Sequence, residues 1–172
     1  MATAVREALA RTRHTAKHLE MRDSYMLDDT NFIRWQQGHR DDPADQASWW
    51  RPWLDVVVAA TERGVSMRRL RIVSEPLSDY TRYEYDVTFT NVAAGEDVRW
   101  LPRSAARDLL LPALDGWIMD DRLLILHHFS GDGQWTGPGM EVCDDARAAE
   151  RYALAYDTAW QRGIPHEEYR PT

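Results

Sequence analysis

The 172-residue sequence is short of cysteine, of lysine and of long apolar runs. Its one cysteine, Cys143, can form no internal disulfide and no cysteine-based zinc site, which is typical of a reducing compartment. The longest apolar runs, residues 56–60 and 123–126, are far below the length that spans a bilayer. Residues 1–20 carry charges throughout and lack the apolar centre of a secretory signal. We therefore expect a cytoplasmic protein with no membrane contact.

A net positive charge is also lacking. The formal net charge is −7, whereas non-specific nucleic-acid binding needs a positive surface that attracts phosphates. We therefore expect no direct contact with nucleic acid. What the chain has in quantity is apolar and aromatic side chains, since 44% of its residues are hydrophobic and eight are tryptophan. This composition predicts a folded chain, and the length suits one substantial core.

Helix signals occur along the whole chain. Residues 1–20 are rich in helix formers and contain no Gly or Pro, so we expect a helix that either docks or oligomerises the protein or frays in solvent. Pro52 in a first turn, apolar residues at helical spacing and a stop at Gly64 predict a second helix. Similar signals predict helices from Asp28 or Asp29 to Gly38, from Leu77 to about Thr90, and from Asp144 or Asp145 to Gly163.

Strand signals lie between these helices. In VSMRRLRIVS (65–74), Leu70 and Ile72 alternate with arginines, which is the period of a β-strand, and Pro76 ends it. A second strand, EDVRWLP (96–102), follows Gly95. A hairpin that turns at Asp120 and Asp121 and a short strand over 134–136 complete the set.

The order of these elements predicts an α+β (or α/β) fold. Its mixed sheet has four or five strands covered by helices, with a possible parallel crossover between the first two strands and an antiparallel hairpin after them. We expect this sheet to form a single domain over residues 46–172. A helical extension and a loop, residues 1–45, precede it.

Six segments carry a resemblance to a known family: HLEMRDSY (18–25), WWRPWL (49–54), RIVSEPLSDYTRYEY (71–85), AGEDVRWLPR (94–103), HFSGDGQW (128–135) and IPHEEYRP (164–171). Through them the chain resembles a domain-of-unknown-function family of actinobacteria, whose members are often encoded near helix-turn-helix regulators of the Xre type. The resemblance implies regulatory association with such a partner. It supplies no catalytic residues.

The C-terminal half is similar to the phospholipase D-like sensor regions of some regulators. The similar part is a strand, a polar turn and a helix that closes over Ala159 to Pro165. The His-x-Lys motif of phospholipase D enzymes is absent, since Lys17 is the only lysine. The resemblance therefore implies a fold that is used for binding.

Nucleophilic and metal sites find little support. A Ser-His-Asp triad would draw on Ser74, Ser78, Asp79, His127, His128 and His166, but no G-x-S-x-G turn is present and the serines suit a strand end and a helix cap. A metal would draw on His18, Glu20 and Asp23, or on His127 and His128, which point to opposite faces of a strand. The Gly131–Gly133 turn lacks the carboxylates of a calcium loop. We predict no catalytic residue, no metal and no cofactor.

The strongest site signal is the charged segment RLRIVSEPLSDYTRYEYD, residues 69–86. Asp79, Arg82 and Asp86 have the spacing of a solvated ladder of ion pairs on a helix. Glu84 shares a face with Leu77 and should point inward, where a carboxylate needs a partner such as Arg71 or Arg99. The candidate ligand-binding residues are Glu75, Asp79, Tyr80, Arg82, Tyr83, Glu84, Arg99, Trp100 and His128.

Two functional hypotheses follow. The first is a non-enzymatic regulatory protein that binds a small molecule or a protein and acts with a DNA-binding helix-turn-helix regulator in trans, as a possible homo-oligomer through the N-terminal helix. The second is an enzyme for a small anionic or nucleotide-like substrate, with an arginine clamp and Glu75, Glu84 or His128 as acid or base. The missing nucleophile, phosphate loop and metal set favour the first. A toxin–antitoxin-like partnership would rest on family context alone.

Overall fold

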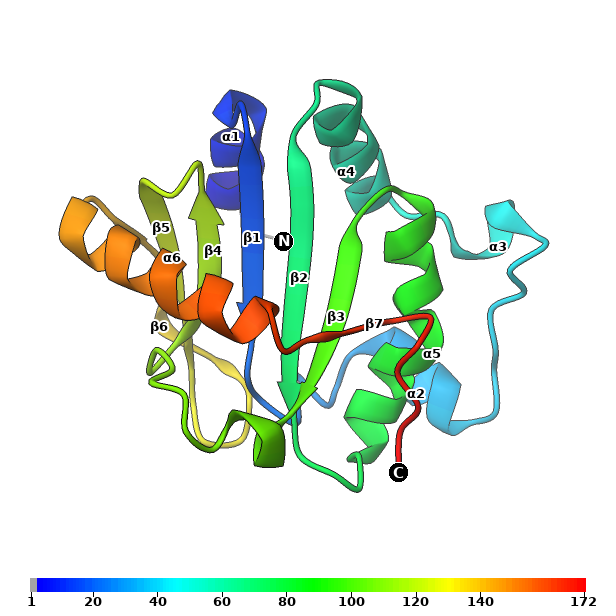
Figure 1. Cartoon of the computed structure of the whole chain (residues 1–172). Helices are drawn as coiled ribbons and strands as arrows, with labels where there is room; N and C mark the ends of the chain where they lie inside the picture. The colour runs from blue at the N-terminus through cyan, green and yellow to red at the C-terminus, as the bar shows by residue number, and fades with distance from the viewer. Residues whose placement is uncertain (1–2) are drawn as a thin grey trace.

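A seven-stranded mixed sheet forms the centre of the protein in the computed structural model, which describes residues 3–172 (Figure 1). Its strands are β1 (Thr15–Glu20), β2 (Ser66–Val73), β3 (Asp97–Pro102), β4 (Asp115–Met119), β5 (Leu123–Phe129), β6 (Trp135–Cys143) and β7 (Ile164–Pro165). They lie in the order β6-β5-β4-β1-β2-β3-β7. The β1–β2 and β2–β3 pairs are parallel, and all the other pairs are antiparallel. The expected α+β class is confirmed, with a larger sheet than the sequence predicts.

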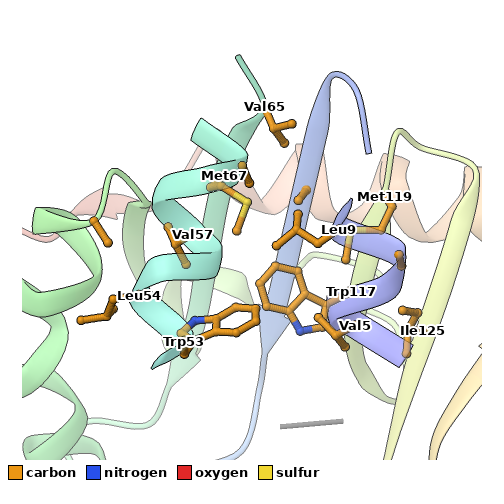
Figure 2. Packing of buried hydrophobic residues seen from close by; sticks show 14 of the residues in the cluster. Val5, Leu9, Trp53, Leu54, Val57, Val65, Met67, Trp117, Met119 and Ile125 are labelled. Atoms are coloured by element: carbon orange, nitrogen blue, oxygen red, sulfur yellow. The ribbon is translucent and has the colours of Figure 1, made fainter. Parts of the chain in front are cut away.

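Helices cover both faces of the sheet. They are α1 (Thr3–Arg11), α2 (Thr30–Gln36), α3 (Gln46–Trp49), α4 (Pro52–Glu62), α5 (Asp79–Ala93), α6 (Ala146–Trp160) and a 3₁₀ turn, η1 (Arg103–Ala106). One face packs against α6 through Leu19, Leu70 and Ile118. The other face packs against α1 and α4 through a cluster that includes Leu9, Val57, Met67 and Trp117 (Figure 2).

The N-terminal segment differs from its prediction. Residues 1–20 were expected to be helical, but α1 ends at Arg11 and Thr15–Glu20 form β1, between β4 and β2. The carboxylate of Asp120 fixes the break, because it accepts the backbone N–H groups of Arg13, His14 and Thr15 at 2.9, 2.7 and 2.9 Å. The strand is buried on both faces and so shows no alternation, and tertiary packing overrides the helix propensity of its residues.

Other expectations agree more closely with the structure. Helix α4 has Pro52 in its first turn, Ser78 and Asp145 cap α5 and α6, and Asp120 and Asp121 form the hairpin turn with φ of 51° and 56°. The boundary expected near residue 45 stays a prediction; β1, from the segment before it, lies inside the sheet. Within residues 3–172 no helix is long and apolar enough to cross a membrane, and the cytoplasmic location stays a prediction.

Candidate functional site

A row of buried charges crosses the sheet face that α4 and α5 cover. Glu20 on β1 accepts hydrogen bonds from Arg69 Nη1 at 2.6 Å and from Arg71 Nε at 2.7 Å, both on β2. Burial opposes ionisation of Glu20, but the guanidinium charges of Arg69 and Arg71 outweigh it and hold the pKa of Glu20 below its ordinary value. Glu20 therefore stays charged and ties the two arginines together.

Each arginine has a second carboxylate partner. Arg69 Nε donates to Glu96 at 3.0 Å, and Glu96 also accepts a hydrogen bond of 2.6 Å from Asn91 Nδ2. Arg71 Nη2 donates to Glu84 Oε1 at 3.4 Å, so Arg71 is the partner that the inward position of Glu84 requires. Arg99, the other arginine proposed for that role, lies on the opposite face, with its guanidinium 4.4 Å from the Trp160 ring centre.

Glu84 has a pKa near neutral pH. Burial raises the pKa of Glu84 to about 7; the charge of Arg71 opposes the rise, and the carboxylate of Glu20 adds to it. The weak 3.4 Å contact with Arg71 accords with this direction, because a short pair would favour the charged form. Glu84 can therefore hold or release a proton in the cavity described below.

The row continues toward β4 and β5. Asp115 accepts a short hydrogen bond from the Tyr25 hydroxyl, and burial raises the pKa of Asp115 to about 6. His18 stacks on Trp117 with ring centres 4.1 Å apart, and burial lowers the pKa of His18 well below its ordinary value. Burial likewise lowers the pKa of His127 to about 4. Both histidines are therefore neutral at pH 7.

A cavity of about 790 Å³ opens over the β2 part of this row. Its lining comes from α2, the 37–51 segment, the start of α4, β2 and α5. Buried side chains form its floor, among them Trp49, Trp53, Arg69, Arg71 and Glu84. Exposed side chains form its rim, among them Arg34, Arg40 and Asp86. The volume suits a small organic molecule.

Two aromatic groups border the cavity. The α2 aromatic group consists of Phe32, Trp35, Tyr80 and Tyr83, whose neighbouring ring centres lie 5.0 to 6.2 Å apart. The α3 aromatic group consists of Trp49, Trp50 and Phe89, with Trp49 5.7 Å from Trp50 and 5.3 Å from Phe89. At the rim, the Arg40 guanidinium lies 4.5 Å from the Trp35 ring centre. Flat aromatic surface and charge thus meet in one site.

The structure brings three of the nine candidate residues into the cavity, namely Tyr80, Tyr83 and Glu84. Trp100 is buried in a separate cluster, although its ring lies 5.0 Å from the Arg71 guanidinium. Glu75 accepts a hydrogen bond from Tyr169, His128 pairs with Glu141 at 2.7 Å, and Arg99 lies across the sheet. Asp79 and Arg82 are exposed on α5 and do not line the cavity.

Sequence reasoning missed Glu20, Arg51 and Arg69 as parts of the site. Glu20 was missed because its segment was expected to be helical. The sequence pattern WWRPW could have indicated the cavity residues Trp49, Arg51 and Trp53, which stand at every second position beside a proline. The serines considered for catalysis are structural: Ser74 donates to Asp23 at 2.7 Å, and Ser78 caps α5. Among the described residues, no group of three or more His, Cys, Asp or Glu side chains is placed to hold a metal ion.

Fold and site together define an α+β protein with a seven-stranded mixed sheet and a charged, aromatic cavity on one face. Residues 3–171 match the family described as domain of unknown function DUF6879, and the chain belongs to this family. No curated protein matches the sequence.

Solved structures show where the same fold occurs. NucT from Helicobacter pylori aligns with a TM-score of 0.52 and 12% identity, over 94% of this chain and 88% of that one. Nuc from Salmonella typhimurium, a phospholipase D family member, aligns with a TM-score of 0.50 and 12% identity, over 97% and 89%. At this identity the likeness shows the fold alone. TrmBL2, an archaeal chromatin protein that binds DNA, gives a TM-score of 0.48 at 12% identity over 93% of this chain; the chain spans 48% of its length.

Proposed function

We propose that the chain is a non-enzymatic regulatory domain that binds a small molecule in the cavity above Glu84 and acts with a DNA-binding helix-turn-helix regulator in trans. The observation that carries the proposal is the cavity itself, about 790 Å³ of space between two aromatic groups and a charged floor. Ligand sites are typically concave, aromatic-lined and supplied with a few fixed polar groups.

The pairing of the floor charges favours binding over catalysis. Arg69 and Arg71 are each held between two carboxylates, so their positions are set before any ligand arrives. A preorganised floor reduces the entropy that a ligand must offset on binding. Residues locked in mutual ion pairs are suited to orient a ligand.

The partner is proposed from the family resemblance, which associates such chains with Xre-type regulators. The test begins with a pull-down of the purified protein with helix-turn-helix regulators encoded beside it. Calorimetry then measures the affinity for any regulator that is retained. We expect a dissociation constant of about 1 μM or below, as in specific complexes. The variant Val87→Trp, whose larger side chain blocks the cavity, should still bind the regulator. Small molecules should not change its affinity for the regulator. Failure to bind any neighbouring regulator would contradict the regulatory part of the proposal.

An enzyme for a small anionic or nucleotide-like substrate is the second candidate, and Glu84 is the observation in its favour. A carboxyl with a pKa of about 7 inside a cavity is poised for general acid–base chemistry. Under this alternative, Glu84→Gln abolishes turnover of a cavity ligand and leaves its binding intact. Under the binding proposal, the ligand is recovered unchanged from both proteins, which mass spectrometry of the incubated mixture distinguishes.

A further inference from the structure

We propose that Arg51 is an anion clamp, whose guanidinium receives the carboxylate or phosphate group of a ring-bearing ligand. This inference rests on the proposed function, because it names the chemistry of the molecule that the cavity binds. The Arg51 side chain lines the cavity.

Arg51 differs from the other two inner arginines in its partners. Its Nη1 donates to Thr90 Oγ1 at 3.0 Å and its Nη2 to Asn91 Oδ1 at 3.1 Å, and both acceptors are neutral. Within residues 3–172 it forms no ion pair with a carboxylate, whereas Arg69 and Arg71 each form two. Burial, and then the neighbouring charge of Arg69, lower the pKa of Arg51. Arg51 therefore carries a partly buried positive charge that no carboxylate of the described residues contacts directly.

The neighbouring indole N–H groups are closed to a ligand. Trp49 and Trp53 are 8% and 6% exposed, and both Nε1 atoms are buried without a hydrogen-bond partner in the described part of the chain. Trp50 Nε1 donates to Asp55 at 2.8 Å. In the segment 49–53, Arg51 is therefore the side chain whose donors can serve an anionic oxygen in the cavity. In Figure 2 the Trp53 indole lies beside that of Trp117 at the edge of the apolar cluster away from Val65.

The backbone places Arg51 at the start of a helix. Trp49 ends α3, Trp50 and Arg51 are extended, and Pro52 begins α4, an 11-residue helix. The N-terminus of α4 adds the positive end of a helix dipole at the same place. The two aromatic groups then supply flat surface for the ring of the ligand. The chemistry that fits is an aromatic carboxylate or a nucleoside monophosphate.

Matched pairs of acids and neutral analogues test the clamp by calorimetry on the full chain. The pairs are benzoate with benzamide and AMP with adenosine, so that the carboxylate and the phosphate are separate arms. We expect at least one acid to bind about tenfold or more tightly than its neutral analogue, since hydrogen bonds to a charged group are worth that factor. Arg51→Gln should remove the preference, and Arg51→Lys should retain part of it. Arg162→Gln, which changes an exposed arginine outside the cavity, should have no effect.

The outcomes separate the two proposals. Equal binding of acid and neutral analogue, or an unchanged preference in Arg51→Gln, overturns the clamp. If acid and neutral analogue bind equally and Val87→Trp abolishes the binding of both, the cavity remains a ligand site and only the clamp fails. If none of the four compounds binds at millimolar concentration, the clamp also fails, and a wider ligand screen then decides the proposed function by itself.

Discussion

At the scale of single residues, Glu20 is the acceptor that allows two arginines to be buried side by side. Its two oxygens bind Arg69 and Arg71 at 2.6 and 2.7 Å. Removing one member of a buried ion network is costly, because the charges that remain have neither water nor a partner. The stability of the cavity floor thus depends on a residue that does not line the cavity.

Glu20→Gln should lower the free energy of unfolding by about 3 to 5 kcal/mol, measured by urea denaturation at pH 7. The matched control is Asp108→Asn, which breaks the exposed 2.6 Å pair with Arg162 and should leave the denaturation midpoint almost unchanged. If both variants lost similar amounts of unfolding free energy, the buried network would contribute no more to stability than the exposed ion pair does.

Glu84 should give stability a distinct pH dependence. Its pKa rises from 4.5 to about 7 on folding, so the folded state holds the proton more tightly than the unfolded state. This contribution is fully present below about pH 4.5 and is lost as pH rises through 7. Glu84→Gln stays neutral at every pH. Between pH 5 and pH 8, the variant should therefore gain on the order of 1 to 3 kcal/mol relative to the unmodified protein.

Urea denaturation of both proteins across that range measures the difference. The lowered pKa values of His18 and His127 have causes other than Glu84, so the contributions of these two histidines cancel in the comparison. The charge of Asp115 acts on Glu84, and this interaction is part of the measured difference. Parallel stability curves for the two proteins would show that Glu84 is ionised throughout the range.

At the scale of elements, the helix caps differ in strength. Asp145 begins α6 and accepts the backbone N–H groups of Arg147 and Ala148 at 2.9 and 3.3 Å. Asp45 begins α3 and makes no such bond. Asp145→Ala should cost about 1 kcal/mol of stability. Asp45→Ala should change the stability by less than about 0.5 kcal/mol. Thermal and urea unfolding measure both variants, and a larger loss in Asp45→Ala than in Asp145→Ala would contradict the prediction.

Most elements were predictable where the signal is local. Pro52, Ser78 and Asp145 mark helix starts, and the Asp120–Asp121 turn fixes the hairpin. The sheet was underestimated because its missing parts depend on tertiary partners. Strand β1 consists of helix formers, and the two-residue β7 exists only through pairing with β3.

The site was predictable only in part, for the same reason. Helical spacing placed Glu84 inward, and the structure confirms Arg71 as its partner. The choice between Arg71 and Arg99 depends on register: Leu70 pairs with Arg99, so Arg71 and Arg99 point to opposite faces. Spacing along one segment cannot reveal Glu20, which meets Arg69 only because β1 joins the sheet beside β2.

At the scale of the whole molecule, the N-terminal segment belongs to the core. The apolar side chains of α1, Val5, Ala8 and Leu9, are buried within the chain, and β1 separates β4 from β2. Oligomerisation through this helix stays a prediction. A chain that begins at residue 21 should lack a cooperative unfolding transition by circular dichroism, because the sheet loses an interior strand. A folded, cooperative shortened chain would contradict this assignment.

The distribution of tryptophan gives the protein an optical property. Four of its eight tryptophans, Trp35, Trp49, Trp50 and Trp53, line the cavity above Glu84. Half of the tryptophans therefore surround the space that a ligand would enter, and a change in polarity or quenching there would alter the emission of the whole protein. The chain carries its own fluorescent reporter of occupancy, and no added label is needed to follow a ligand in real time.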